Sequence, residues 1–398
     1  MSIRYRDMRQ AGSAPLVLVA LLTCAAMVGC TRQGGQGPGG KTGASGSQPV
    51  IAVGFIGPLS GDAASFGVSQ KTGIELAANE LNARGGITGK AVKVVFEDSQ
   101  LDQNKAITAF NKLVDSDKAQ VILGETSSAN TLAIGPLAQR KGVLLVSPIA
   151  SAADLTRSGF RMFRVSPSDS FQAKVAAQFA QGKRWKTAAV LYTNDAWGSG
   201  LMEGFTSDFT SLGGKILTRE AVEPKTQDLK TQLTKIKSLA PDVVYIPLHP
   251  DEAIVAFRQA AQLGLRTAFL GADSFSEPTV REAAGDAVNG VTYTVPAPGS
   301  GEVFRRFAEA YKAKYGTEPN YNAAAAYDSV MVLAEAAKSA RSIDAAGLAD
   351  ALAGVKGFQG ASGLISFDAN GDVVSKAYDI MRIEHGKPIV SQSGVTVK

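Results

Sequence analysis

The stretch VIAVGFIGPLSGDAASFGVSQKTGIELAANELNARGGITGKAVKVVF, residues 50–96, contains two short β-branched runs, 50–56 and 91–96. Between the runs, apolar residues have the i, i+3, i+4, i+7 spacing of an amphipathic helix: Ile74, Ala77, Ala78 and Leu81. Gly85-Gly86 ends that helix. The order strand, helix, strand predicts a right-handed βαβ unit with parallel strands.

The same alternation continues along the chain. Further strands are predicted at 120–123, 143–146, 187–192, 215–221, 243–246 and 268–270. Helices are predicted around Ile107, Phe110 and Val114, and at 131–140, 198–212, 227–239, 251–263 and 277–284. Short strands that alternate with helices predict parallel sheets covered by helices on both faces, which is an α/β fold.

The length of 398 residues favours two domains. Breaks in the pattern fall at 165–168 (VSPS) and 296–299 (PAPG), and two long apolar-striped helices follow the second break. Near the end, strands at 363–367 and 373–383 flank Asp368-Ala369-Asn370-Gly371-Asp372. That stretch begins like a calcium loop but lacks the Gly at position six and the Glu at position twelve, so a hairpin turn is predicted.

The N-terminus predicts export. Three Arg residues precede an uncharged apolar run, 14–28, that is too short for a stable membrane helix and ends in Met27-Val28-Gly29-Cys30. This resembles a bacterial lipobox, so residues 1–29 are predicted to be a lipoprotein signal peptide and Cys30 the lipidated residue; an uncleaved anchor is the alternative. Residues 30–49 are rich in Gly and Ser and predict a flexible tether. Within them, 35–42 fits the phosphate-loop pattern, but no strand precedes it and no helix follows, so we interpret it as coincidence.

Composition excludes several classes of function. Of 41 Lys+Arg and 36 Asp+Glu, three bases and one acid lie before residue 30, which leaves 38 minus 35, or +3, for the rest. This weak, dispersed charge argues against nucleic-acid binding. Two Cys and two His are too few for a structural zinc site, and no cofactor or metal is predicted. His249 and His385 belong to no hydrolase motif, so the chain is not predicted to be an enzyme.

Residues 51–91 resemble the opening of the periplasmic branched-chain amino-acid-binding proteins, the leucine/isoleucine/valine receptors of ATP-driven importers. The GPLSGxxAxxG loop and the NxxGGIxGK turn carry the resemblance, which extends over 50–385. It implies two Rossmann-like lobes of the type I periplasmic-binding fold, joined by a three-segment hinge. We therefore expect lobe 1 to comprise 50–168 with 296–364, and lobe 2 to comprise 169–295 with 365–398.

The resemblance also implies ligand contacts. Ser128 matches the family's carboxylate-binding Ser, with Ser127 beside it, and Ser151 matches a Thr with the same role, although plain N-capping is the alternative for both positions. Asp273 falls where the family has the carboxylate that meets the ligand's ammonium, with an N-cap as the alternative. The remaining predicted contacts are Phe66, Ile149, Ala150, Trp197, Leu248 and His249. The family's disulfide is absent here, because Ser127 occupies one of its positions.

Taken together, these features predict a lipid-anchored, monomeric solute-binding protein. It is expected to close its lobes around an L-amino acid, branched-chain or otherwise aliphatic, and to deliver it to a membrane permease of an ABC importer. The alternatives are a relative that binds amides, urea or aromatic acids, and a sensing module without transport.

Overall fold

The computed structural model describes residues 50–61, 63–374 and 376–396. The predictions made for the signal peptide, Cys30, the tether and the 35–42 pattern lie outside these residues. Within the described part of the chain, no helix has the length and apolar character needed to cross a membrane.

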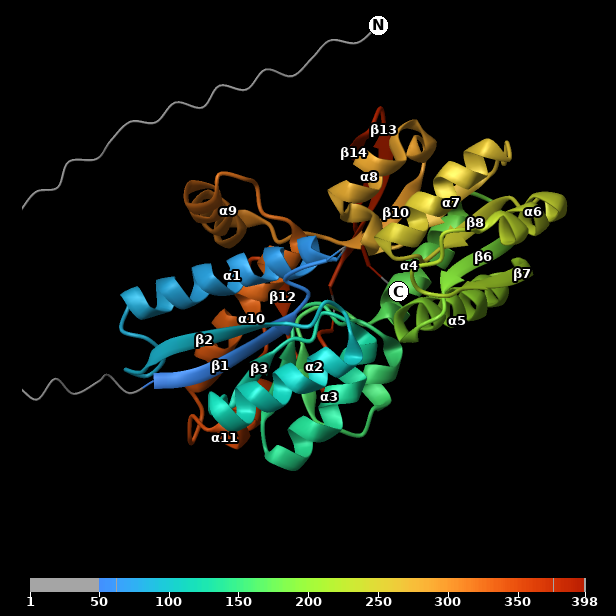
Figure 1. Ribbon diagram of the computed structural model, residues 1–398. Coiled ribbons are helices and arrows are strands. Elements are labelled where there is room, and N and C mark those ends of the chain that lie inside the picture. Colours follow the sequence, from blue (N-terminus) through green and yellow to red (C-terminus); the bar gives the residue numbers. More distant parts are fainter. Residues whose placement is uncertain (1–49, 62, 375, 397–398) are drawn as a thin grey trace, which may run out of the picture. The chain divides into compact units, whose positions relative to one another are not determined.

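The first half of the chain builds a five-stranded parallel sheet in the order β2-β1-β3-β4-β5. Its strands are β1 (Val50–Gly57), β2 (Ala91–Asp98), β3 (Val121–Leu123), β4 (Leu144–Ser147) and β5 (Met162–Arg164). Its helices are α1 (Ala64–Ala83), α2 (Gln103–Asn111), α3 (Ser128–Lys141), α9 (Gly301–Tyr315), α10 (Tyr321–Ala337) and α11 (Ala345–Ala353). A π-helical turn, Lys112–Ser116, extends α2. This sheet and its helices are lobe 1 (Figure 1).

The side chains of β1 explain why both faces of this sheet are covered. Ile51, Val53 and Phe55 are buried in one core cluster, together with α1 and α10. Ile56 points into a second cluster with α2 and α3. Successive residues of a strand face opposite sides, so a strand that is apolar throughout needs helices on both sides, as predicted.

A seven-stranded sheet forms the second lobe, in the order β14-β13-β10-β9-β8-β6-β7. Its strands are β6 (Thr187–Thr193), β7 (Lys215–Val222), β8 (Val243–Ile246), β9 (Ala268–Gly271), β10 (Thr292–Pro296), β13 (Tyr378–Glu384) and β14 (Lys387–Val395). Helices α4 (Asp169–Gly182) and α5 (Ala196–Ser211) cover one face. Helices α6 (Lys230–Leu239), α7 (Pro250–Gln262) and α8 (Pro278–Ala284) cover the other face. Strands β6 to β10 are parallel, whereas β13 and β14 add an antiparallel edge.

The chain passes between the two sheets three times. The first passage lies between β5 and α4, the second between β10 and α9, and the third before β13. A small antiparallel sheet, β11 (Phe358–Gly360) and β12 (Gly363–Ile365), precedes the third passage. Because Ile365, Phe367 and Val373 all pack in a lobe 1 core cluster, we propose that the third boundary lies between 374 and 377 rather than at 364.

The strand predicted at 373–383 begins only at Tyr378. Val373 forms an isolated antiparallel bridge with Phe367, and the Asp368 N–H donates to the Asp372 carbonyl over 2.9 Å. The turn predicted at 368–372 is therefore present. Its pairing stops after one bridge, because the chain then leaves lobe 1.

Arg164, at the end of β5, ties this turn to a loop of lobe 1. Its fully buried guanidinium donates from Nε to Asp372 Oδ1 at 2.6 Å, from Nη1 to the Ala152 carbonyl at 2.8 Å and from Nη2 to Thr156 Oγ1 at 2.6 Å. Thr156 Oγ1 also donates to Asp372 Oδ2 at 2.6 Å. A buried charge is tolerated only when it is paired and hydrogen-bonded in this way.

Arg164→Met should therefore leave the Asp372 carboxylate without its positively charged partner and lower the free energy of unfolding by about 3–5 kcal/mol. Arg157→Met is the control, because the Arg157–Asp154 pair is 74% and 63% exposed, and should change stability by less than about 0.5 kcal/mol. Urea unfolding followed by circular dichroism measures both. Equal effects of the two variants would contradict the role assigned to Arg164.

Candidate functional site

Each sheet has one point where the strand order reverses. In lobe 1 it lies between β1 and β3, and in lobe 2 between β6 and β8. Ligands of open parallel sheets bind beyond the carboxyl ends of the strands at such switch points. The predicted contacts occupy the segments that follow these strands and their neighbours: Phe66, Ser127, Ser128, Ile149, Ala150, Ser151, Trp197, Leu248, His249 and Asp273.

Ser127 and Ser128 begin α3 and have different roles. The Ser127 hydroxyl accepts a 3.4 Å hydrogen bond from the Asn130 N–H, so Ser127 is the N-cap. Ser128 Oγ accepts from the Ser151 and Ala152 N–H groups at 3.2 and 3.1 Å. Since a hydroxyl has two acceptor positions and one proton, the Ser128 O–H is left to donate. It is 5% exposed and lies at the positive end of a helix, where an anion is favoured.

The loop after β4 holds Ile149, Ala150 and Ser151. Ile149 packs partly buried against the lobe 1 core, and the Ala150 N–H donates to Ser147 Oγ at 2.9 Å. The capping pattern predicted at Ser151 does not form, because the following 3₁₀ turn, Ala153–Arg157, starts after Ala152 and has no side-chain cap. The Ser151 hydroxyl is thus not used for capping.

Glu125 contacts the segment that precedes α3. Its side chain is fully buried and accepts a 2.7 Å hydrogen bond from the Ser127 N–H. Burial raises the pKa of Glu125 to about 7, although Ser99 and the Ser127 N–H pull it back in part. The acid is therefore held in a place where its neutral form is favoured near neutral pH.

Asp273 begins a 3₁₀ turn, Asp273–Ser276, directly after β9. Its N-capping alternative is wrong, since Glu277 precedes α8 at the N-cap position. Gln172 Nε2 donates to Asp273 Oδ1 at 3.2 Å and also to Thr294. Burial raises the pKa of Asp273 above its ordinary value. A cation placed beside Asp273 would offset this cost of burial.

Asp169 is a fully buried carboxylate near the partly buried Asp273, and sequence reasoning missed it. Both of its oxygens are buried without a hydrogen-bond partner. Burial, followed by the charge of Asp273, raises the pKa of Asp169 well above its ordinary value. The Ser151 hydroxyl lowers this pKa in part, although its geometry falls short of a full hydrogen bond to either oxygen. The Asp169 N–H donates to the Ser151 carbonyl at 2.8 Å and so joins the two lobes.

The sequence offered only an ambiguous signal for Asp169. Ser168 precedes it and caps α4, with its hydroxyl accepting from the Ser170 N–H at 3.4 Å. An acid in the first turn after such a cap is ordinarily explained by the helix dipole. Only the fold shows that this acid is buried near Asp273.

Trp197 and His249 form one wall of the lobe 2 switch point. Their rings stack with centroids 4.7 Å apart, and His249 Nε2 lies 2.7 Å from Asp195 Oδ2. Burial alone would lower the His249 pKa, but the hydrogen bond and charge of Asp195 outweigh it and raise the pKa. The same contact lowers the pKa of Asp195 against the effect of burial. The contact with Asp195 therefore fixes the orientation of the imidazole ring.

Phe66 and Leu248, two further predicted contacts, differ in how deeply their side chains are buried. Phe66 lies in the first turn of α1, partly buried, and its carbonyl accepts from Gln70 Nε2 at 3.1 Å. The Leu248 side chain is fully buried in the lobe 2 core, and its carbonyl accepts from Ser274 Oγ at 2.7 Å. Leu248 thus connects the loop after β8 to the segment that carries Asp273.

The chemistry of the two lobes is complementary. Lobe 1 offers the Ser128 hydroxyl at a helix N-terminus, and lobe 2 offers the Asp273 carboxylate, with Asp169 at the passage between them. Such an arrangement can hold a small molecule that carries one negative and one positive group. Within the described residues, no group of three or more His, Cys, Asp or Glu side chains is placed to hold a metal ion.

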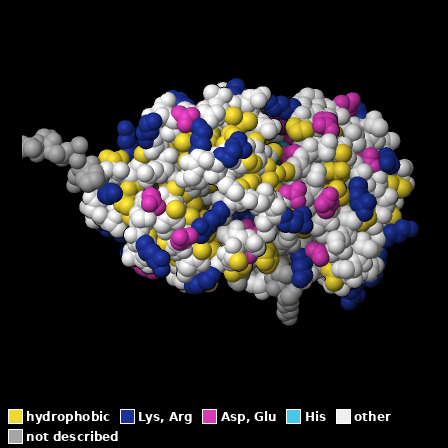
Figure 2. Space-filling model, turned by 90° about the horizontal axis from the view of Figure 1, so that it is seen from below, with side chains coloured by type: hydrophobic (Ala, Val, Ile, Leu, Met, Phe, Trp, Pro, Cys, Tyr) yellow, Lys and Arg dark blue, Asp and Glu magenta, His cyan; other side chains and the backbone are white. Residues whose placement is uncertain are grey.

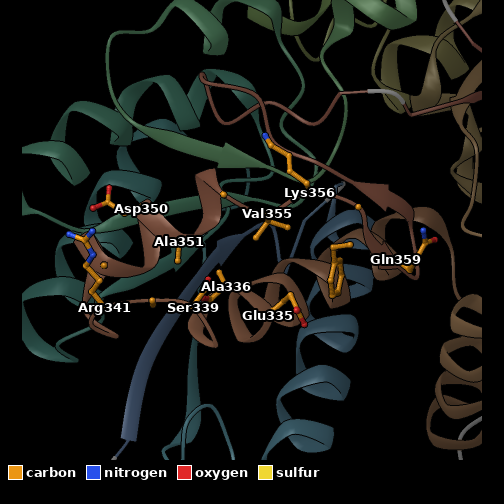
Figure 3. Close-up of a pocket in the computed structure, with 14 residues that line it drawn as sticks. Glu335, Ala336, Ser339, Arg341, Asp350, Ala351, Val355, Lys356 and Gln359 are labelled. Atoms are coloured by element: carbon orange, nitrogen blue, oxygen red, sulfur yellow. The ribbon is translucent and has the colours of Figure 1, made fainter.

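Two other surfaces lie away from the predicted contacts or carry no concentrated charge. A pocket of about 810 Å³ lies on lobe 1 between α10, α11 and β11 (Figure 3). None of the predicted contacts lines it, and two of its acids already have partners, Asp350 with Arg161 at 2.7 Å and Glu335 with Lys338 at 2.6 Å. On the face shown in Figure 2, basic and acidic side chains are interspersed, so that face carries no basic stripe of the kind that binds nucleic acid.

Two α/β lobes with a polar site at both switch points define a two-lobed binding protein. A family model described as periplasmic binding protein matches residues 50–388, and the chain belongs to that family. The Leu/Ile/Val-binding protein BraC3 of Rhizobium johnstonii is 30% identical over 86% of this chain and 94% of its own length. The fold predicted from the sequence is thereby confirmed.

Two solved structures are similar over nearly their whole length. The leucine binding protein LivK of Thermotoga maritima has a TM-score of 0.82 and 31% identity, covering 87% of this chain and 99% of its own. The branched-chain amino acid transporter substrate binding protein LivJ of Streptococcus pneumoniae, in complex with isoleucine, has a TM-score of 0.79 and 30% identity, covering 88% and 99%.

The raised pKa of Glu125 makes the stability of the folded chain depend on pH. Its pKa is about 7 in the folded chain, against 4.5 as the ordinary value. Between these values the folded state holds a proton that the unfolded state has released, so the stability contributed by Glu125 is lost as pH rises. Glu125→Gln should therefore gain stability relative to the wild type between pH 4.5 and 8, by about 3 kcal/mol.

Urea unfolding at several pH values measures this difference. Glu203→Gln, a change at an exposed position of α5, is the control and should show no such trend. A Glu125→Gln effect that is the same at pH 5 and pH 8 would contradict the prediction.

Proposed function

We propose that this protein captures an L-amino acid, branched-chain or otherwise aliphatic, between its two lobes and delivers it to the permease of an ABC importer. The observation that supports this most directly is a hydroxyl donor at a helix N-terminus, Ser128 in lobe 1, together with two neighbouring carboxylates, the partly buried Asp273 and the fully buried Asp169. An amino acid carries both charges that such a site would neutralise.

The names of similar proteins support the same ligand class. BraC3 is named for leucine, isoleucine and valine, and the LivJ structure contains isoleucine. This chain belongs to the same family and has Ser128 and Asp273 at the positions that the resemblance assigns to the ligand, which supports the same ligand class. Binding rather than catalysis is supported by the names of these relatives, which are binding proteins.

The proposed binding sequence starts on lobe 1. The ligand carboxylate accepts from the Ser128 hydroxyl and from the N-terminus of α3, with Ser151 beside it. Asp273 from lobe 2 then meets the ammonium group, which couples binding to lobe closure. Trp197, the neighbouring His249 ring and Phe66 are proposed to contact the ligand side chain, and the Ile149 and Ala150 backbone completes the lobe 1 wall.

The cellular setting is proposed from the N-terminus and the family. We propose an exported protein with a lipid anchor at Cys30, acting as a monomer. A sensing module without transport remains the second use of the same site, and the genes beside this one distinguish the two through the presence or absence of permease and ATPase subunits.

Isothermal titration tests the ligand class. The panel contains the twenty amino acids together with acetamide, urea and benzoate, and the tightest binding is expected for leucine, isoleucine or valine. Two analogues of leucine, 4-methylpentanoate without the amine and 3-methylbutylamine without the carboxylate, should each bind at least about 30-fold more weakly. Tight binding of benzoate with no response to any amino acid would contradict the proposal.

Asp273→Asn tests the role of the lobe 2 carboxylate. Removing one partner of a buried charge pair costs about 2–5 kcal/mol, so leucine affinity should fall by at least about 30-fold. Affinity for 4-methylpentanoate should stay within about twofold, because that analogue has no ammonium group to lose. Asp286→Asn, an exposed change in the same lobe, is the control. An equal loss for both ligands would show that Asp273 does not pair with the ammonium.

A further inference from the structure

A buried hydrogen bond joins the lobes beside the chain passages, next to Tyr321, whose hydroxyl contacts Ser166 and Lys376. Asn322 Nδ2, in the first turn of α10 in lobe 1, donates to Glu277 Oε1 of lobe 2 at 3.0 Å. The two residues are 8% and 1% exposed. The two residues are 45 positions apart in the chain and belong to different lobes, so this contact holds the two lobes against each other in the structure.

Glu277 is linked through a short segment to Asp273, the carboxylate proposed to bind the ligand's ammonium group. It follows the 3₁₀ turn Asp273–Ser276, and its N–H donates to the Ser274 carbonyl at 3.3 Å. Ser274 Oγ in turn donates to the Leu248 carbonyl at 2.7 Å. A short, internally bonded segment thus carries Asp273 at one end and Glu277 at the other.

The Glu277 carboxylate depends on Asn322 for a hydrogen bond. Its second oxygen, Oε2, is buried and has no hydrogen-bond partner, so the bond to Asn322 satisfies the carboxylate only in part. A hydrogen bond to a charged group corresponds to a factor on the order of tenfold to a hundredfold in an equilibrium constant. Loss of the Asn322 amide would therefore weaken the closed arrangement of the lobes.

We propose that Glu277 and Asn322 form a latch between the lobes, and that both are positioning residues that stabilise closure without touching the ligand. This inference rests on the proposed function only in assuming that a ligand is held between the lobes. The latch is expected to lengthen the lifetime of the bound state rather than speed its formation.

The test uses Asn322→Ala, Glu277→Ala and the double variant. Leucine binding is followed by stopped-flow tryptophan fluorescence, and lobe closure by the radius of gyration from small-angle X-ray scattering, with and without leucine. Each single variant should raise the dissociation rate about tenfold and leave the association rate within about twofold. The double variant should be no worse than Glu277→Ala, because both changes remove the same contact.

Two controls keep the result specific. Glu282→Gln changes an exposed acid of α8 and should leave both rates unchanged. Glu277→Gln keeps a carbonyl oxygen as acceptor and should lose less than Glu277→Ala. The latch would be overturned if the dissociation rate of the double variant rose by the product of the two single effects. An unchanged dissociation rate in Asn322→Ala, or an equal effect of Glu282→Gln, would also overturn it.

The scattering measurement separates the latch from the choice of ligand. In the ligand-free protein, Asn322→Ala should increase the radius of gyration relative to the wild type. If leucine fails to bind the wild type, the proposed ligand is wrong, and this ligand-free comparison still decides the latch. Identical ligand-free values for variant and wild type would overturn it.

Discussion

The direction of the strands is the constraint on which the candidate site depends. All five strands of the lobe 1 sheet are parallel, as are β6 to β10 of lobe 2, so every loop that follows one of these strands emerges at the same edge. Residues far apart in the chain, such as Ser128 and Ser151, therefore meet there through direct hydrogen bonds. Helices on both faces fix these edges, because the strands are apolar on each side.

The charges at the site are divided between the lobes. Lobe 1 supplies hydrogen-bond donors, whereas the carboxylate of Asp273 belongs to lobe 2 and Asp169 stands at the first passage. Neither half by itself offers partners for both ends of a dipolar molecule. Burial raises the pKa of both acids. Their charged forms therefore cost folding free energy, which favours a role in binding over a role in stability.

Sequence alone predicted most of the fold and part of the site. Periodic strands and helices are local patterns, so their order was predictable, whereas Ser128 and Asp273 were proposed as ligand contacts from the family resemblance. Asp169 and Glu277 could not be predicted, because an acid beside a helix start is typical of a cap and only tertiary packing buries it. The strand predicted from 373 was wrong at its start for a similar reason, since Asp372 is drawn to Arg164 in another part of the chain.

The network around Arg164 bears on how the lobes can turn. It clamps the backbone at Ala152, next to the proposed anion-binding loop, to Asp372 at the root of the third passage. Val373 at that root packs in the lobe 1 core, and the first residue of the lobe 2 strand β13 is Tyr378. Since only a few residues separate that core from the edge of the lobe 2 sheet, we expect the third passage to act as a short tether that limits how far the two edges can part.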